Sequence, residues 1–536
     1  MILSASKKVK NQYSKLIIII IPLSLSAFTH LWNLDGFPSI YRDEDHYLRK
    51  TMHVLRGLGP QEGPKELLSY PLTPYAHPYF GQFFLAGILG IIGYPDSLHT
   101  TTDVSSIKEI FIIPRMLMGI LAIFDTFLLF KIAERRYNTT VGLIASVLFA
   151  VMPLTWIMRR IWLEPIQLPF LLGSILLALY AADLNLNQKR KIITIALISG
   201  TFLGLAIFTK IPVMAMIPLV GFILYSKTRN FKILGLWLAP VLLIPLIWPL
   251  YALSQGEFNE WVSSVLWQAE RQNTGLFTAI GKLFDIDPVL VVFSFVGFVY
   301  AIVRRRDLFL ILWFVPFLAI NFLSGYTFYW HLVPIFPAFC ISFAILIADI
   351  TKIFRSNRIK KLLPYTVLSI LAIFGLVVTT MLIGLNLTSF HYEVISVLGN
   401  EIQKANKVKN PDSFHDNGSN EIQKVTVLGN NYFLWFPKYI FDINGTNDYK
   451  NYYHYGDIKT KKVILLVGAN FIDEMTRYNE TNANVGGVGE LLFNSNLSTI
   501  VVENQSAIPR PNTYPFSSLV DLDPWAPSKF DIRGNY

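Results

Sequence analysis

The stretch Tyr41-Arg42-Asp43-Glu44-Asp45-His46-Tyr47 places three consecutive carboxylates shortly after a long apolar run, residues 16–34. A run of about 20 apolar residues can cross the bilayer core as a helix. Carboxylates held against a membrane surface are explained either by a solvated loop or by a catalytic base. The polar residues further along the chain favour the catalytic base.

The composition is that of a polytopic membrane protein. Of 536 residues, 53% are hydrophobic and only 15% are charged, and the mean hydropathy is +0.44. The single cysteine, Cys340, excludes a disulfide framework and a cysteine-ligated metal site. The sequence contains no P-loop and no glycine-rich dinucleotide motif, which argues against a nucleotide-driven pump or a kinase.

About eleven apolar runs approach the length needed to span a bilayer. They are 16–34, 110–132, 141–157, 165–183, 192–209, 211–226, 233–252, 287–303, 307–323, 332–349 and 363–385. Short cytoplasmic loops are rich in Lys and Arg. With a cytoplasmic N-terminus, every predicted inner loop is basic, from Lys131/Arg135/Arg136 through Lys189–Lys191 and Arg304–Arg306 to Arg358/Lys360/Lys361. The pattern predicts an N-terminus inside and a C-terminus outside.

That topology requires that residues 78–94 do not cross the bilayer. This segment is short, glycine-rich and flanked by His77 and Pro95. Counting it as a span would place all later basic loops outside. We therefore expect a helix that lies in the outer interface.

The tail from residue 386 differs from the rest of the chain. It holds 13 Lys and Arg against 16 Asp and Glu, whereas the whole chain has a net charge of +10. Short apolar runs at 425–428 and 463–467, and another within 491–502, predict buried strands, and 392–405 predicts a helix. N-x-S/T sequons mark acceptor positions on an extracytoplasmic surface. They begin at Asn386, Asn417, Asn444, Asn479, Asn496 and Asn504.

We therefore predict a transmembrane catalytic domain over 1–385, whose first outer loop is 35–109, and a soluble extracytoplasmic α/β domain over 386–536.

In this topology most unusual polar residues fall on the outer side. Cations at outer helix ends run against the positive-inside trend, and charges at membrane depth usually line a cavity or meet a partner. The structural alternatives are interfacial snorkelling and pairing along one helix, such as Arg160 with Glu164 at i,i+4.

Several cations beside a carboxylate cluster fit transfer of a sugar from a lipid phosphate. The leaving phosphate develops negative charge that Arg, Lys and His can hold. The attacking hydroxyl must lose a proton, which a positioned Asp or Glu can accept. Neither a metal nor ATP is required, although the sequence does not exclude a divalent metal.

These motifs resemble those of the GT-C glycosyltransferases, which are embedded in membranes and use polyprenyl-phosphate sugars. The resemblance is to the protein O-mannosyltransferases and to the bacterial aminoarabinose transferases that modify lipid A. It covers roughly residues 15–350. The matching features are Asp43 to Tyr47, His77-Pro78-Tyr79, Arg115, Arg159 to Glu164, Lys210, and the run Tyr329 to Pro334.

The resemblance implies an inverting enzyme with Asp43 as the base, or else Glu44. It implies a substrate-binding set for lipid phosphate and sugar that comprises His46, Tyr47, His77, Arg115, Arg159, Arg160, Glu164, Lys210, Tyr329 and His331. Relatives often carry Arg or Lys where this chain has His46 and His77, and Asp where it has Glu164. Neutral histidines would hold phosphate more weakly and make activity sensitive to pH.

The predicted function is transfer of a sugar from a polyprenyl (dolichyl-type) phosphate to a hydroxyl of a protein, lipid or glycan on the outer face of a cell membrane. No nucleic acid partner is expected. The alternatives are a transporter or flippase of a lipid-linked glycan, for which Asp125 is the main mid-span charge, and a non-catalytic scaffold.

Overall fold

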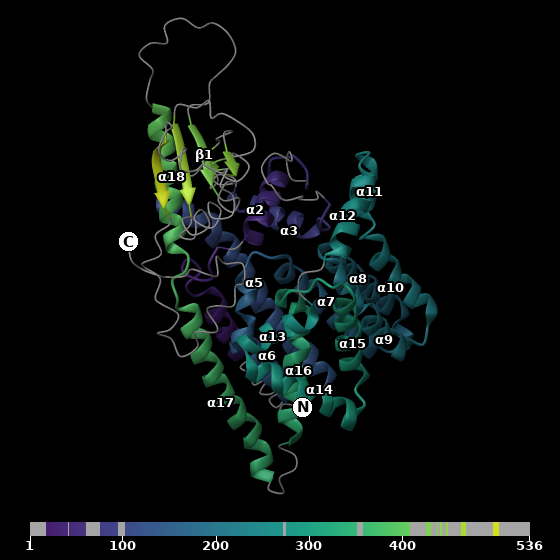
Figure 1. The fold of residues 1–536 in the computed structure, drawn as a ribbon. Coiled ribbons are helices and arrows are strands. Elements are labelled where there is room, and N and C mark those ends of the chain that lie inside the picture. The colour runs from purple at the N-terminus through teal and green to yellow at the C-terminus, as the bar shows by residue number, and fades with distance from the viewer. Residues whose placement is uncertain are drawn as a thin grey trace, which may run out of the picture. The chain divides into compact units, whose positions relative to one another are not determined.

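The computed structural model describes most of the membrane part of the chain and short segments of the tail. The described residues are 18–40, 42–60, 75–94, 102–271, 275–350, 357–407, 425–429, 437, 440–441, 446–448, 462–467 and 497–502. By contacts, the chain divides into two compact units. Figure 1 labels their helices and strands where there is room. Unit 1 comprises 1–34, 73–81 and 115–385, and unit 2 comprises 35–72, 82–114 and 386–536.

Among the described residues, eight helices are long and apolar enough to cross a membrane. They are α5 (Val104–Arg136), α7 (Leu163–Asp183), η3–α8 (Leu186–Thr209), η4–α9 (Ile211–Thr228), α10–α11 (Phe231–Ser254), α14–η5 (Pro288–Arg305), η6–α16 (Tyr329–Ile350) and the 362–383 part of α17 (Asn357–Ile383). The chain is thus a polytopic α-helical membrane protein. Helices at Ile18–Leu31 and α15 (Leu308–Leu323) are apolar but shorter, so the expected total of eleven stays a prediction.

One further pair of apolar helices is sharply bent. α6 (Thr139–Val151) and η2 (Pro153–Arg159) meet at an angle of 68°. Met152 between them has extended backbone, and Pro153 cannot continue the preceding helix because it lacks an N–H group. The break ends at Arg159 and Arg160, directly before α7 begins at Leu163. The length of the apolar run predicted one span over 141–157.

The core of unit 1 lies around α16 (Phe336–Ile350), since 89% of the span η6–α16 is buried inside the protein. The outermost spans, α10–α11 and α14–η5, are only 22% and 28% buried, as expected for helices that face lipid. α14 (Pro288–Tyr300) packs along α16, where Ser294 Oγ donates to Phe339 O and Ser342 Oγ donates to Ser294 O, each at 2.9 Å.

Acidic residues at one end of the bundle are paired with arginines. Arg135 Nε lies 2.7 Å from Asp183 Oδ2, and Arg136 Nη2 donates to Asp307 Oδ1 at 3.0 Å. Arg305 makes two bonds to Asp349, of 2.7 and 2.6 Å. These contacts place the ends of α5 and α7 and the η5–α15 connection on the same end of unit 1. This is the end at which the sequence predicts the basic inner loops.

Close packing between α8 and α10 (Phe231–Leu243) depends on a glycine. A Cβ at Gly200 would overlap the carbonyl oxygen of Trp237, which is backbone and cannot move aside. Gly200 lies in α8. Gly235, by contrast, lies in α10 and is exposed, and a Cβ added there would have no atom within 4 Å.

We expect Gly200→Ala to lower the free energy of unfolding by about 1–3 kcal/mol, because overpacking a helix contact forces backbone shifts. Gly235→Ala should leave it unchanged or raise it by up to about 1 kcal/mol, since alanine favours the helix. Thermal unfolding in detergent measures both. Equal melting temperatures for the two variants would refute the packing argument.

Unit 2 contains a four-stranded parallel sheet in the order β2-β1-β3-β4. Its strands are β1 (Val425–Gly429), β2 (Thr446–Asp448), β3 (Lys462–Val467) and β4 (Leu497–Val502). α18 (Ser389–Lys407) packs on β1, β3 and β4. Three strands and the helix lie where the sequence predicts them, and β2 was not predicted.

Unit 2 also includes α2 (Arg42–Leu55) and residues 82–91 of α3 (Phe80–Ile91). A Cβ at Gly90 of α3 would lie 3.1 Å from Leu55 at the end of α2, so the two helices touch. Leu387 N donates to Gly36 O at 2.7 Å, and Thr388 Oγ1 donates to Pro38 O at 2.6 Å. These bonds join the chain after the first helix to the segment that leads into α18.

Candidate active site

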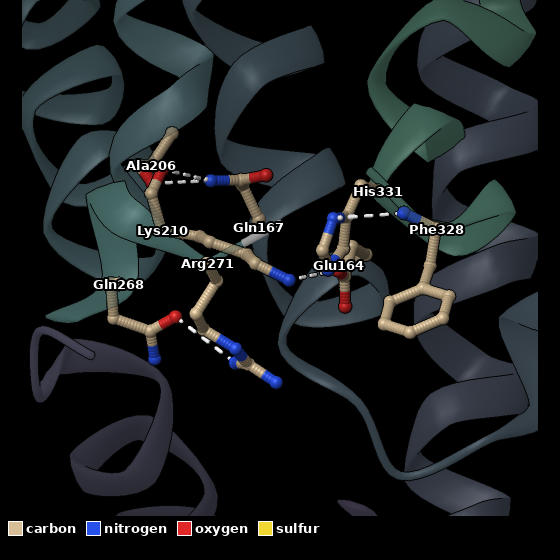
Figure 2. Close-up of polar contacts among 8 residues, drawn as sticks. All are labelled: Glu164, Gln167, Ala206, Lys210, Gln268, Arg271, Phe328 and His331. Carbon is tan, nitrogen blue, oxygen red and sulfur yellow. Dashed lines mark hydrogen bonds and ion pairs between the residues drawn. The ribbon is translucent and has the colours of Figure 1, made fainter. Parts of the chain in front are cut away.

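A buried ion pair forms the centre of the candidate site in unit 1 (Figure 2). Lys210 Nζ contacts Glu164 Oε1, and the side chains are 10% and 2% exposed. Glu164 lies in the first turn of α7, where a carboxylate is favoured by the helix dipole. Lys210 follows the last residue of α8, so the pair joins the start of one span to the end of the next.

Gln167 holds the end of α8 in place. Its Nε2 donates to Ala206 O at 2.8 Å and to Lys210 O at 2.7 Å. Gln167 follows Glu164 by three residues, so both side chains lie on one face of α7. The sequence analysis did not select this residue, although a glutamine in an otherwise apolar run was a usable signal.

Replacement of Gln167 by Met would leave two buried carbonyl groups without this donor. We expect a loss of about 1–3 kcal/mol in the free energy of unfolding, together with displacement of Lys210. The measurement is thermal unfolding beside the Gln167→Glu variant, which keeps the shape and removes the donor. If both variants melt like the wild type, the amide does not fix this helix end.

Further basic side chains lie near the ion pair, and Figure 2 shows that His331 and Arg271 come from separate segments of unit 1. The ring of His331, in η6 (Tyr329–Ile335), has Lys210, His77 and Arg271 as electrostatic neighbours. His331 Nδ1 accepts from Phe328 N at 3.3 Å.

Arg271 follows α12 (Phe258–Glu270) and is held by aromatic rings and an amide. Its guanidinium lies 3.7 Å from the centroid of the Tyr326 ring and 4.6 Å from that of Trp267, and Nη1 donates to Gln268 Oε1 at 3.2 Å. A stacked, planar guanidinium is pre-organised to bind an anion with two parallel N–H groups.

Aromatic side chains cover one side of this region. Tyr75, Tyr79, Phe208 and Trp248 form a buried cluster against which Trp261 packs. Tyr75 Oη donates to Glu257 Oε2 at 2.5 Å, which joins the 73–81 segment to the chain before α12. Burial raises the pKa of Tyr79 well above its usual range, so its hydroxyl stays protonated.

Two arginines that were predicted to bind substrate donate hydrogen bonds to main-chain carbonyl groups. Arg159 Nη2 donates to Trp32 O, and Arg115 Nη1 donates to Leu34 O at 3.2 Å. Both residues are fully buried, and each is an electrostatic neighbour of the other. They hold the end of the first helix, which immediately precedes the acidic stretch.

Arg160 does not pair with Glu164 as the i,i+4 spacing allowed. Its guanidinium lies 5.2 Å from the ring centroids of both Trp156 and Trp162. Trp162 in turn contacts Trp330, with ring centroids 5.0 Å apart, and Tyr329 lies 4.9 Å from Trp330. Arg160 and Tyr329, both selected from the sequence, therefore belong to one group of contacting aromatic side chains.

The acidic stretch forms the start of α2 in unit 2. Asp43, Glu44 and Asp45 all belong to this helix. Asp43 is half-buried and Glu44 is fully buried. Acids in a first turn are favoured by the helix dipole. His46 is half-buried and lies 5.4 Å from the ring of Tyr47, which is buried.

Within the part of the chain that the structure describes, no group of three or more His, Cys, Asp or Glu residues has the arrangement of a metal site. Of the predicted glycosylation positions, Asn386 is exposed and its Oδ1 accepts from Ser389 N at 3.1 Å, at the start of α18. The other five positions lie outside the described residues.

The fold is that of the GT-C class. The structure is similar to that of ArnT from Cupriavidus metallidurans bound to undecaprenyl phosphate, with a TM-score of 0.55 and 14% identity over 90% of this chain and 89% of that one. The apo form of the same protein gives a TM-score of 0.54 at 13% identity, over 89% of this chain and 91% of that one.

A second similarity is to the Archaeoglobus fulgidus oligosaccharyltransferase tethered with an acceptor peptide. Here the TM-score is 0.51 and the identity 12%, over 80% of this chain. The chain spans 63% of the length of that oligosaccharyltransferase.

Residues 104–252 match the family described as dolichyl-phosphate-mannose-protein mannosyltransferase. No curated protein sequence matches the chain. The family match covers α5 to α11, which includes the ion pair of Glu164 and Lys210. The resemblance inferred from the motifs is thereby confirmed at the level of fold and of this segment.

Proposed function

We propose that this protein is an inverting glycosyltransferase that moves a sugar from a polyprenyl phosphate to a hydroxyl acceptor on the extracytoplasmic face. The observation that carries the proposal is the cluster of basic side chains formed by Lys210, Arg271, His331 and His77 beside the buried Lys210–Glu164 ion pair. A GT-C-like fold and the match over 104–252 support it.

In this proposal the cluster binds the phosphate of the donor. Lys210 is held by Glu164, so its ammonium is positioned before a ligand arrives. Arg271 offers a planar guanidinium packed against two aromatic rings, and a neutral histidine ring can add one N–H donor. Negative charge that develops on the leaving phosphate would be stabilised by fixed cations in a partly dry site.

The reaction would proceed in one displacement. The acceptor oxygen forms a bond to the anomeric carbon, while the bond from that carbon to the phosphate oxygen breaks. The polyprenyl phosphate leaves with the bonding electrons, and the acceptor proton passes to Asp43. The half-buried position of Asp43 supports its role as the base over that of the fully buried Glu44.

Binding of the donor phosphate can be tested without chemistry. Purified protein would be titrated with a fluorescent polyprenyl phosphate, with unlabelled polyprenol as the competitor. We expect Arg271→Gln to weaken binding about tenfold or more, since hydrogen bonds to charged groups contribute about 1.5–3 kcal/mol. Lys282→Gln, on exposed α13 (Leu276–Ile286), is the matched control and should bind normally.

Competition by polyprenol as strong as that by the phosphate would contradict the cluster as a phosphate site. So would equal weakening in both variants, because Lys282 pairs with Asp285 at 3.4 Å on the surface of its own helix.

A transporter of a lipid-linked glycan is the second candidate. It is favoured by Asp125 in α5, which is fully buried and whose two carboxylate oxygens have no hydrogen-bond partner among the described residues. Ionisable groups inside spans are expected in transporters. The transporter proposal predicts movement of an intact glycolipid and no release of polyprenyl phosphate.

A further inference from the structure

A pocket of about 230 Å³ lies where α7 ends, α8 begins and α9 (Ile217–Thr228) ends. This is the opposite end of α7 from Glu164, so the pocket is separate from the candidate active site. Its polar lining consists of Asn185, Lys227 and Thr228. Thr228 Oγ1 donates to Leu224 O at 2.8 Å, so its hydroxyl oxygen can serve a ligand only as an acceptor.

The chain around this pocket is strongly and uniformly basic. Residues 184–232 contain no Asp or Glu. Leaving aside Lys210, which pairs with Glu164 at the other end, all the cations of this segment are exposed. They are Lys189, Arg190, Lys191, Lys227, Arg229 and Lys232.

The nearest acid does not balance this charge. Asp183, the last residue of α7, is held by Arg135 at 2.7 Å, and Arg135 also lies 3.7 Å from the centroid of the Tyr180 ring. The first turn of α8 carries Lys189, Arg190 and Lys191 and no acid. Cations there oppose the helix dipole, so a bound anion would relieve an unfavourable arrangement.

Apolar side chains surround the same pocket. Leu184, Leu186 and Ile192 are part of its lining, and Leu186 is 63% exposed. Phe231, at the start of α10 next to this end, is 71% exposed. Exposed apolar side chains beside lysines are typical of the boundary between lipid tails and headgroups, and they are not expected around a site for a soluble phosphate.

From these observations we propose that the ends of α7, α8 and α9 form a binding site for the phosphate headgroup of an anionic membrane phospholipid. Lys227 and the first turn of α8 contact the phosphate, and the Asn185 amide donates to its oxygens. Thr228 accepts from a glycerol hydroxyl, and the leucines contact the acyl chains. The site is independent of the proposed transferase reaction.

The test uses the full-length protein in detergent, titrated with phosphatidylglycerol or phosphatidylcholine, with bound lipid counted by native mass spectrometry. We expect tight binding of phosphatidylglycerol only. Lys191→Gln combined with Lys227→Gln should weaken it by about tenfold or more, since each cation near a membrane surface contributes about a factor of five. Lys227→Arg, which keeps the charge, should bind as the wild type does.

The control removes two exposed cations from another loop at the same end, Arg304→Gln with Arg306→Gln. An equal loss in the control would overturn the proposal, because it would show general surface attraction only. Displacement of the lipid by free glycerol 3-phosphate at matched concentration would also overturn it, since the ligand would then be a soluble phosphate. Normal melting of both double variants excludes unfolding as the cause.

Discussion

Replacement of Asp43 by Asn is expected to lower the rate of sugar transfer by about 10²–10⁴-fold, the usual contribution of a positioned general base. The amide has the shape of the carboxylate but cannot accept the acceptor proton. Because the phosphate contacts are retained, affinity for a polyprenyl phosphate should be unchanged. The measurement is release of polyprenyl phosphate from a donor sugar, run beside the binding titration.

Glu44→Gln is the matched control for Asp43→Asn. Glu44 is the next residue of α2 and is fully buried, so we expect its amide variant to change the stability of unit 2 and not the rate of turnover. Loss of activity in Glu44→Gln alone would move the base by one residue and keep the function. Normal activity in both variants would refute an acid of this stretch as the base.

The second large effect is expected at the buried ion pair. Lys210→Met leaves the Glu164 carboxylate buried without its cation, which typically costs about 3–5 kcal/mol. Glu164→Gln should cost a similar amount. The double variant, Glu164→Gln with Lys210→Met, should recover most of that loss, because no uncompensated charge is left.

Donor binding should behave differently from stability in these variants. Lys210→Met and the double variant both lack the ammonium that would hold the phosphate, so both should bind a polyprenyl phosphate more weakly. Restored stability with weak binding would support a role in the site. Restored stability together with restored binding and turnover would show that the pair only holds α7 against α8.

Most membrane helices could be predicted from the sequence, because the length of an apolar run is itself the signal for a span. The lengths of the long runs locate the spans, and short apolar runs in the tail locate β1, β3 and β4. The break between α6 and η2 was missed, although Pro153 marks it, because an apolar run alone does not show where its helix bends.

The site was only partly predictable, because its pairings join distant parts of the chain. Glu164 and Lys210 were both selected from the sequence, but the only pairing considered for Glu164 was the structural alternative with Arg160, four residues away. The structure places Lys210 there, from the end of the next span, and leaves Arg160 between two indole rings. Local spacing cannot anticipate a contact that depends on how two spans pack.

For Arg115 and Arg159 the structure shows a contact within the protein where the sequence predicted a contact with substrate. Both were expected to contact substrate, and in the structure each donates to a carbonyl group at the end of the first helix. Unpaired carbonyl groups at a helix end need donors, and long cationic side chains can supply them. A role in substrate binding for these two arginines stays a prediction.

The most direct test of the proposed transferase is release of polyprenyl phosphate by the wild-type protein in lipid vesicles. A panel of polyprenyl-phosphate sugars would be supplied with hydroxyl acceptors, and both the released lipid and the glycosylated acceptor would be followed. We predict release with at least one donor, matched mole for mole by inverted product. Transfer of intact donor lipid between leaflets without any release would contradict the proposal and identify a transporter.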